Sequence, residues 1–327
     1  MIQLKYPKFW DRRGILSTLF MPFSFLYIFL GYLRRLAAKP VRLPGFVICV
    51  GNMTVGGTGK TQFTQYLAKK LQVNNHKLLI VTKGYGSKLK GAKLVTKTDL
   101  ALDVGDESKL LSEYGQVLAA RSIKAAIPLI SKLDPDIIIF DDGMQNPSFI
   151  KDLTILVVDP IRAIGNGRIF PSGPLREKAT PAISRSDIVI FVGDDPCTNF
   201  SLVQAIISSQ KPFFKSKIQI ESHIEKDKKY YAFAAIGNPQ RFFRLLAESG
   251  ANLVMTKSFP DHHNYSPAEI NELIQEAEHR NCKLITTKKD YVKISNTKYI
   301  ECADATLSFD QENELLELIN EKIKAHI

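Results

Sequence analysis

Cysteine is scarce in this sequence. Its 327 residues include four cysteines, which stand far apart and form no C-x-x-C pair: Cys49, Cys197, Cys282 and Cys302. Structural zinc sites and disulfide frameworks both rely on cysteines at short, recognisable spacings. The sequence therefore indicates neither kind of site, and it fits a reducing cytosol.

Acidic residues are outnumbered by basic ones. Lys and Arg total 44 against 33 Asp and Glu, which gives a net charge of +11 and a pI of about 9.3. Such an excess attracts an anionic partner: a nucleotide, an anionic lipid or a nucleic acid. The sequence lacks the interleaved aromatic and basic strip of RRM or OB folds. We therefore expect no nucleic-acid partner, and no motif indicates a protein partner.

Charge is absent from residues 15–33, ILSTLFMPFSFLYIFLGYL. Nineteen helical residues span about 28 Å, close to the roughly 30 Å hydrocarbon core of a bilayer. Basic residues flank the run on both sides, so there is no positive-inside asymmetry. We expect residues 1–38 to form a helix lying on an anionic membrane surface. A spanning helix and a buried soluble helix remain alternatives.

Small residues predict how this helix meets the rest of the chain. Ser17, Ser24 and Gly31 recur every seven residues and would form one stripe that rests on the protein body. Pro22 would start, kink or interrupt the helix.

A glycine-rich motif is the strongest functional signal. An apolar run over residues 46–50 precedes it and an expected helix over residues 63–71 follows, which is the order of a phosphate-binding P-loop. Lys60 would reach the β- and γ-phosphates of ATP, and the Thr61 hydroxyl would hold Mg²⁺. The first glycine of the usual pattern is replaced by Thr54. We expect ATP to bind along Thr54, Val55, Gly56, Gly57, Thr58, Gly59, Lys60 and Thr61.

Two acidic pairs follow the loop along the chain. Asp141 and Asp142 end an apolar strand, and carboxylates at that end of a parallel strand match the Walker B position that holds Mg²⁺. Asp106 and Glu107 open a short helix. On residue type alone, Asp106 is more typical of a helix cap and Glu107 of a favourable first-turn charge.

The order of elements predicts an α/β fold. We expect a P-loop NTPase-type, mostly parallel sheet with helices on both faces over residues 39–222, and a smaller C-terminal α/β domain over residues 223–327. In the smaller domain we place strands at 230–236, 251–257 and 283–287 and helices at 239–249, 266–281 and 310–325. The long Gly/Pro loop over residues 165–177 is either structural slack or, near a nucleotide, a lid or substrate loop.

The smaller domain also carries a histidine pair. His262 and His263 precede an expected helix and could belong to a cap region, a metal site or a catalytic base. Adjacent residues of an extended chain point to opposite sides, so we do not expect them to share one metal.

Taken together, these motifs resemble the tetraacyldisaccharide 4′-kinase (lipid A 4′-kinase) family over nearly the whole chain. Further shared segments are Val104-Gly105-Asp106-Glu107, Asp141-Asp142-Gly143-x-Gln145, Gly165-Asn166-Gly167-Arg168, Gly173-Pro174-Leu175-Arg176-Glu177, Asp261-His262-His263 and Thr286-Thr287-x-Lys289-Asp290. The chain departs from the family pattern at Lys83 (usually Arg), Asn146 (usually His) and Lys288 (usually Glu).

The resemblance implies transfer of the ATP γ-phosphate to the 4′-hydroxyl of a tetraacyldisaccharide 1-phosphate. The product would be lipid IVA, made at the cytoplasmic face of the bacterial inner membrane. The resemblance also implies that Asp106 accepts the hydroxyl proton and that His262 pairs with Asp106. Glu107 would join Thr61, Asp141 and Asp142 around Mg²⁺.

Two other classes of protein remain as alternatives. A membrane-bound ATPase switch of the partitioning type also uses a Gly-Gly-x-Gly-Lys-Thr loop, but its signature lysine precedes the glycine pair, where this chain has Val55. A basic nucleic-acid-binding ATPase would show salt-dependent binding to DNA or RNA.

Overall fold

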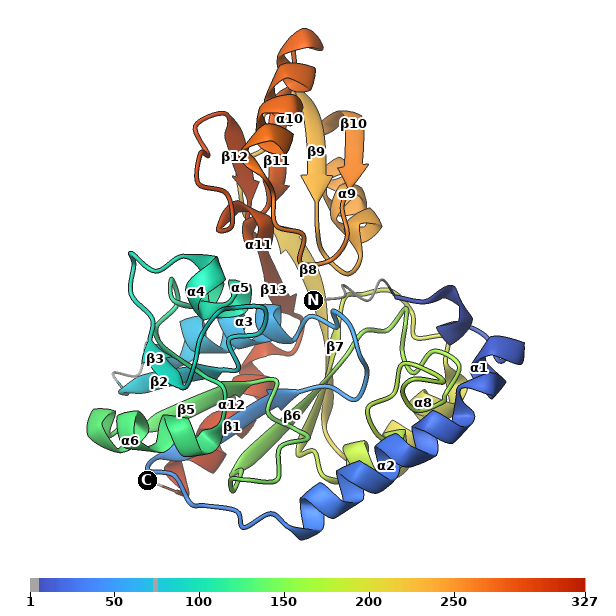
Figure 1. Ribbon diagram of the computed structural model, residues 1–327, viewed down its shortest axis with the longest axis vertical. Helices are drawn as coiled ribbons and strands as arrows, with labels where there is room; N and C mark the ends of the chain where they lie inside the picture. The colour runs from blue at the N-terminus through green and yellow to red at the C-terminus, as the bar shows by residue number, and fades with distance from the viewer. Residues whose placement is uncertain (1–5, 73–75, 327) are drawn as a thin grey trace.

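The computed structural model describes residues 6–72 and 76–326 and confirms the α/β class. A large unit carries a nine-stranded sheet, and a smaller unit with a four-stranded sheet stands on it (Figure 1). The large sheet has the order β13-β8-β7-β6-β1-β5-β2-β4-β3. Its central strands are parallel; β3 and β13 pair antiparallel with β4 and β8 at the two edges.

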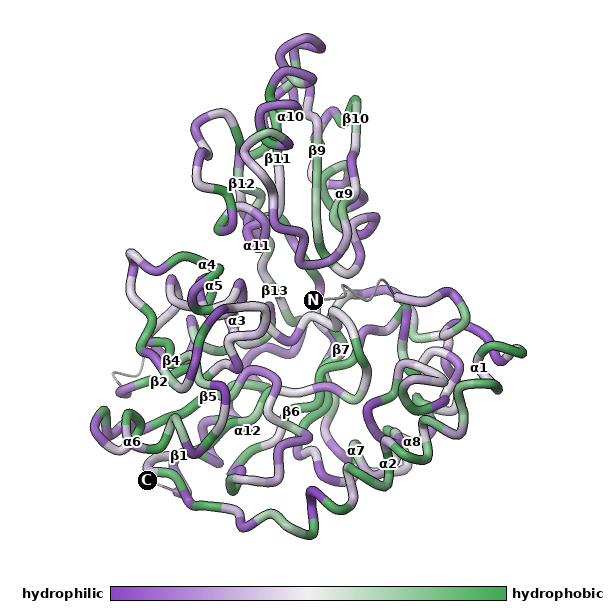
Figure 2. Tube along the Cα trace, viewed as in Figure 1, coloured by the Kyte–Doolittle hydropathy of each residue, from purple (hydrophilic) through white to green (hydrophobic). Residues whose placement is uncertain are grey.

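The central strands are apolar along most of their length (Figure 2). They are β1 (Phe46–Gly51), β2 (Leu78–Thr82), β5 (Ile137–Asp141), β6 (Leu153–Val158) and β7 (Ile188–Val192), and every residue in them is buried. Towards the edges lie β3 (Ala92–Leu94), β4 (Gln116–Ala120), β8 (Phe213–Ile220) and β13 (Ala305–Phe309). A parallel sheet covered on both faces requires such continuous apolar runs.

Helices cover both faces of the large sheet, as the sequence predicts. On one face α3 (Lys60–Gln72) and α12 (Glu312–Lys324) pack into one apolar cluster with the strands. On the other face lie α6 (Ile123–Leu133), α7 (Ala179–Ser184) and α8 (Phe200–Ser208). The carboxyl ends of the central strands remain free at one edge, where a ligand can bind.

The smaller unit is an all-parallel sheet of order β10-β9-β11-β12 with a helix on each face. Its elements are β9 (Lys229–Ala234), α9 (Pro239–Glu248), β10 (Asn252–Ser258), α10 (Pro267–His279), β11 (Lys283–Thr287) and β12 (Ile300–Ala303). Separate apolar clusters lie under α9 and α10. The expected alternation of strands and helices is therefore present.

We expected residues 223–327 to form the smaller domain, but the last part of this range belongs to the large unit. β13 leaves the smaller unit and pairs with β8 in the large sheet. The final helix, α12, then buries Leu315, Ile319 and Ile323 in the large core, beside α3. The apolar spacing predicted this helix correctly, but spacing does not reveal which sheet a helix covers.

The uncharged N-terminal run forms two helices rather than one. α1 (Ile15–Leu19) and α2 (Met21–Leu36) break at Phe20, just before Pro22. Ser17 and Ser24 are buried against the body, as the stripe of small residues predicts, but a Cβ atom at Gly31 would meet nothing within 4 Å, so the stripe ends at Ser24. Across residues 6–72 and 76–326, every helix is too short or too polar to cross a bilayer.

Asn166 binds the N-terminal segment to the large unit. Its Nδ2 donates to Phe9 O at 3.2 Å, to Ser17 Oγ at 2.9 Å and to Ser172 O at 3.0 Å. Trp10 is 2% exposed, and its Nε1 donates to Pro171 O at 2.9 Å. The loop over residues 165–177, for which a lid was one expectation, thus anchors α1 and α2.

Replacing Asn166 by alanine should loosen this anchor. The change removes the side-chain donor to Phe9 O and the Oδ1 atom that accepts from Arg168 N, so we expect the free energy of unfolding to fall by about 1–3 kcal/mol. Trypsin should also cut the folded variant faster at Arg34 and Arg35. Urea denaturation and timed proteolysis measure the two effects. Asn296→Ala, at an exposed position, is the control and should change neither.

Candidate active site

The phosphate-binding loop lies between β1 and α3, as predicted. Gly56 and Gly59 have φ angles of 115° and 88°, in the left-handed region that favours glycine. A Cβ atom at Gly59 would also lie 2.5 Å from Val192 Cγ1. The loop leads directly into the N-terminus of α3 at Lys60. Its geometry therefore suits anion binding by backbone N–H groups and the helix dipole.

Neighbouring segments brace this loop. Val55 N donates to Pro174 O at 2.7 Å, and Arg176 N donates to Met53 O at 2.8 Å. Within the loop, Asn52 Nδ2 donates to Thr58 Oγ1 at 3.0 Å. The segment over residues 173–177 thus holds the loop in shape.

Asp141 lies beside the start of α3. The parallel register sets Val50 of β1 opposite Asp141 of β5. Thr61 Oγ1 and Thr64 Oγ1 donate to the two oxygens of Asp141 at 3.0 and 3.2 Å. Burial raises the pKa of Asp141 to about 6, although Lys60 opposes that shift.

The Thr61 hydroxyl and the Asp141 carboxylate together suit a magnesium ion. A hydroxyl and a carboxylate beside a phosphate-binding loop are hard oxygen ligands, and Mg²⁺ usually completes its shell with water and substrate phosphates. Among the described residues, no three His, Cys, Asp or Glu side chains come together as a closed metal cage. Thr61 and Asp141 therefore fit a Mg²⁺ ion that arrives with a nucleotide.

Asp142, the other half of the expected pair, faces cations instead. Lys60 Nζ lies 3.8 Å from its carboxylate, Arg176 Nη1 2.7 Å and Lys83 Nζ 3.6 Å. Burial alone would raise the pKa of Asp142, but these three charges outweigh it and hold the pKa well below its usual range. Burial also lowers the pKa of Lys60, against the pull of Asp142. Asp142 therefore orients Lys60.

Asp106 lies next to His262 of the smaller unit. It begins α5 (Asp106–Leu111), but Gly105 occupies the cap position and no side chain caps the helix. Asp106 Oδ2 instead lies 3.0 Å from His262 Nδ1, although the two residues are 156 positions apart. The cap expected from residue type is therefore wrong, and the pairing implied by the resemblance is present.

The neighbouring histidine points elsewhere. His263 Nε2 lies 3.0 Å from Glu269 Oε1, and its ring stacks on Phe259 with centroids 5.0 Å apart. The adjacent histidines thus have separate partners, although the backbone at His262 has a φ of 60° and is not extended as we assumed.

Lys289 lies between Glu107 and His262 and contacts both. It lies on α11 (Lys288–Tyr291), with its Nζ 3.4 Å from Glu107 Oε1, 3.6 Å from Asp261 Oδ1 and 3.2 Å from His262 Nε2. Burial alone would lower the pKa of Lys289, but Glu107 and the other carboxylates outweigh it and raise that pKa. Glu107, expected near Mg²⁺, is thus ion-paired with a lysine.

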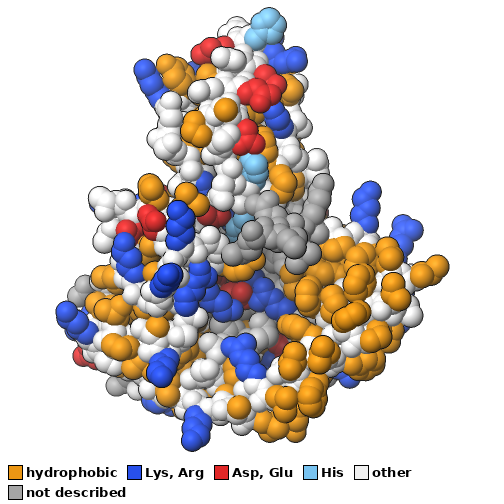
Figure 3. All heavy atoms as spheres, in the orientation of Figure 1, with side chains coloured by type: hydrophobic (Ala, Val, Ile, Leu, Met, Phe, Trp, Pro, Cys, Tyr) orange, Lys and Arg blue, Asp and Glu red, His pale blue; other side chains and the backbone are white. Residues whose placement is uncertain are grey.

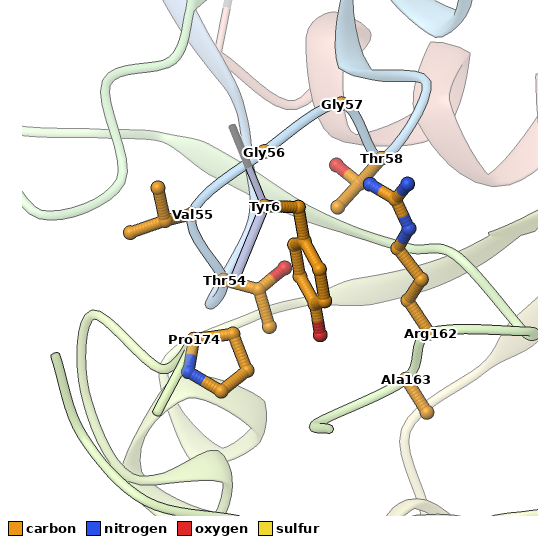
Figure 4. A pocket seen from close by; sticks show the side chains of 9 residues that line it. All are labelled: Tyr6, Thr54, Val55, Gly56, Gly57, Thr58, Arg162, Ala163 and Pro174. Carbon is orange, nitrogen blue, oxygen red and sulfur yellow. The ribbon is translucent and has the colours of Figure 1, made fainter. Parts of the chain in front are cut away.

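The smaller unit also reaches the phosphate-binding loop. Arg162 extends towards Thr58, and the ring of Tyr6 lies between Thr54 and Arg162 (Figure 4). The Arg162 guanidinium is 4.6 Å from the centroid of that ring, and Nη2 donates to Gly237 O at 2.5 Å. A cation from the large unit thus connects the loop to the turn between β9 and α9.

Sequence reasoning gave no role to three of these cations. Arg176 and Lys289 lie within the motifs that carry the resemblance, which was a usable signal, but their partners are distant in the chain. Nothing in the sequence marked Arg162. Asn146, where the family usually has histidine, has a local role: its Oδ1 accepts a hydrogen bond from Ser148 N at 3.1 Å.

The two adjacent aspartates should affect stability in opposite directions. The folded protein raises the pKa of Asp141 from 3.8 to about 6, so the advantage of its neutral form is present below pH 4 and is lost as pH rises through 6. At one pKa unit per 1.36 kcal/mol, the charged form costs about 3 kcal/mol. Asp141→Asn should therefore raise the melting temperature at pH 7.5 in chelator.

Asp142→Asn is the matched comparison. The pKa of Asp142 is lowered, so its charge stabilises the fold above pH 4, and this variant should melt below the parent at pH 7.5. Below pH 4, Asp141→Asn and the parent should melt together. Shifts of the same sign for both variants at pH 7.5 would contradict this account.

Comparison with known proteins identifies the family. A family model described as "Tetraacyldisaccharide-1-P 4'-kinase" matches residues 16–324. A tetraacyldisaccharide 4′-kinase of Rickettsia canadensis (strain McKiel) is 48% identical over 325 residues, covering 99% of this chain and 98% of that protein. Another, from Rickettsia bellii (strain OSU 85-389), is 46% identical, covering 98% of this chain and 100% of that protein.

A solved structure agrees. The crystal structure of the "apo" form of LpxK from Aquifex aeolicus in complex with ATP has a TM-score of 0.74 and 26% sequence identity, covering 94% of this chain and 100% of that one. The family match, the two relatives and this fold agree with the geometry of the site. The chain belongs to the tetraacyldisaccharide 4′-kinase family.

Proposed function

We propose that this chain transfers the γ-phosphate of ATP to the 4′-hydroxyl of a tetraacyldisaccharide 1-phosphate, forming lipid IVA. Family membership makes it a kinase of lipid A biosynthesis. The observation that carries the residue roles is the contact of Asp106 with His262, 3.0 Å long, made between the two units beside the phosphate-binding loop.

The loop over residues 54–61 would bind ATP. Backbone N–H groups and the N-terminus of α3 cradle the phosphates, and Lys60, held by Asp142, contacts the transferred group. Thr61 and Asp141 would hold Mg²⁺, which would neutralise phosphate charge when bound. Glu107 is ion-paired with Lys289, so we assign it no part in holding that ion.

Asp106 would act as the general base. The sugar oxygen attacks the γ-phosphorus, the bond from that phosphorus to the ADP oxygen breaks, and the hydroxyl proton passes to Asp106. His262 orients this carboxylate from the other unit. The base is therefore complete only when the two units are together, which couples proton transfer to closure over both substrates.

Changing Asp106 and His262 tests this pair. Asp106→Ala and His262→Ala should each lower kcat by about 10²–10⁴-fold with little change in ATP affinity. The double variant should be barely worse than the poorer single one, because the residues act as a unit. Transfer of labelled phosphate to a tetraacyldisaccharide 1-phosphate provides the assay.

The adjacent histidine supplies the control. His263→Ala removes a side chain of the same loop that points to Glu269, and it should keep kcat within about threefold. Multiplicative losses in the Asp106/His262 double variant would show independent roles and exclude the shared one.

We also propose that α1 and α2 bind an anionic membrane at the cytoplasmic face of the inner membrane. They expose a continuous apolar surface, seen beside basic side chains in Figure 3. Its members include Ile15, Leu16, Leu19, Phe23, Phe25, Leu26, Phe29, Leu30, Tyr32, Leu33 and Leu36. Apolar area next to basic residues suits peripheral binding at a lipid surface.

Acidic substitutions on this surface should release the protein from membranes. Phe23 and Leu30 are 58% and 55% exposed, so Phe23→Glu/Leu30→Glu should leave the fold intact while losing lipid contact and adding repulsion. Sedimentation with vesicles containing anionic lipid measures the loss. Val254→Glu/Tyr299→Glu, exposed apolar positions of the smaller unit, is the control. If both double variants sediment with the vesicles equally well, the membrane contact does not lie on α1 and α2.

A further inference from the structure

Lys289 sits on a rigidly held turn. α11 follows β11 directly, and Thr287 caps it by accepting a hydrogen bond from Asp290 N at 3.1 Å. Asp290 is fully buried, and its Oδ2 accepts from Ala235 N at 2.8 Å. The lysine is therefore presented by a fixed element rather than by a loose loop.

The ammonium of Lys289 restricts what His262 can do. An ammonium group donates hydrogen bonds and cannot accept them. Its Nζ is 3.2 Å from His262 Nε2, so that ring nitrogen must be the acceptor. The single proton of the neutral imidazole then lies on Nδ1 and is donated to Asp106 Oδ2 at 3.0 Å.

Two carboxylates favour the opposite arrangement. Glu107 Oε1 and Asp261 Oδ1 lie 3.7 and 3.9 Å from the same Nε2 atom and would favour a proton there. Lys289 Nζ lies closer to each of them, at 3.4 and 3.6 Å. The ammonium is thus the nearer cation for both carboxylates and balances their charge, although Asp261 Oδ1 accepts no hydrogen bond from it.

We propose that Lys289 is a positioning residue that keeps the proton of His262 on Nδ1, directed at Asp106. With the proton on Nε2 alone, the Nδ1 lone pair would face the Asp106 carboxylate and turn it away from the substrate hydroxyl. The inference rests on the proposed role of Asp106 as the base. It gives a role to a lysine that never touches the reacting atoms.

Kinetics of matched variants test this role. Lys289→Met keeps the volume of the side chain and removes its charge. We expect kcat to fall about 10- to 100-fold, which is part of the roughly 10²–10⁴-fold rate increase that a general base provides. ATP binding and the KM for the lipid should change less than threefold. In a His262→Ala background, the same substitution should cost less than twofold more, because Lys289 acts through that histidine.

Lys288→Met is the structural control. The neighbouring lysine also joins the units, with its Nζ 2.6 Å from Asp304 Oδ2 and 2.9 Å from Tyr114 Oη, but it bonds to neither residue of the base. It should keep kcat within threefold. Two results together would overturn the proposal: Lys288→Met lowers kcat as much as Lys289→Met does, and Lys289→Met still lowers activity in the His262→Ala background. They would show that Lys289 only stabilises contact between the units.

Nuclear magnetic resonance reads the proton directly. In protein labelled with ¹⁵N-histidine, with His262→Ala assigning the signal, the parent should show His262 protonated on Nδ1 and not on Nε2. Lys289→Met should show a proton on Nε2. A proton on Nε2 in the parent, or no change in the variant, overturns the proposal. If His262→Ala keeps full activity, the proposed role of Asp106 and His262 in proton transfer fails. The spectra of the parent and of Lys289→Met still show which nitrogen of His262 carries the proton.

Discussion

The antiparallel pair of β8 and β13 carries the smaller unit. The chain leaves the large sheet through β8 and returns through β13, with Ala305 paired to Ile220 and Phe309 to Ser216. Both ends of the smaller unit are therefore fixed to one edge of the large sheet. Contacts between the units, from His262 to Asp106 and from Gly237 to Arg162, depend on this double connection.

The two units meet near the site through polar groups. The main apolar clusters lie under the helices of one unit or the other, although Leu245 of α9 packs against the core of the large unit. Between the units lie ion pairs such as Lys289 with Glu107, and Arg241 with Asp159 at 3.4 Å. Interfaces of this polar kind allow domains to move, whereas large apolar ones resist it. The contact between Asp106 and His262 can thus be broken and remade without unfolding either core.

Sequence alone predicted much of this architecture. Continuous apolar runs gave the central strands, and the glycine loop placed Lys60 and Thr61 correctly because a P-loop is local in the chain. The path of the last strand was not predictable, since pairing of β13 with β8 depends on neighbours in space. The partners of Asp106, Glu107 and Asp142 were hidden for the same reason. For Asp106 and His262, only the resemblance supplied the pairing.

The return of the chain end to the large sheet has a consequence for biosynthesis. Tyr66 of the nucleotide-binding helix packs on Phe309 with ring centroids 4.8 Å apart and donates a hydrogen bond to Glu312 at 3.1 Å. A ribosome adds about 5–20 residues per second, and Glu312 follows Tyr66 by 246 residues. The nascent chain therefore leaves the side of α3 that contacts Phe309 uncovered until β13 and α12 have been synthesised. A chain that stopped near residue 300 would lack both β13 and α12. The helix that begins at Lys60 would then lose the packing of Tyr66 on Phe309 and its hydrogen bond to Glu312.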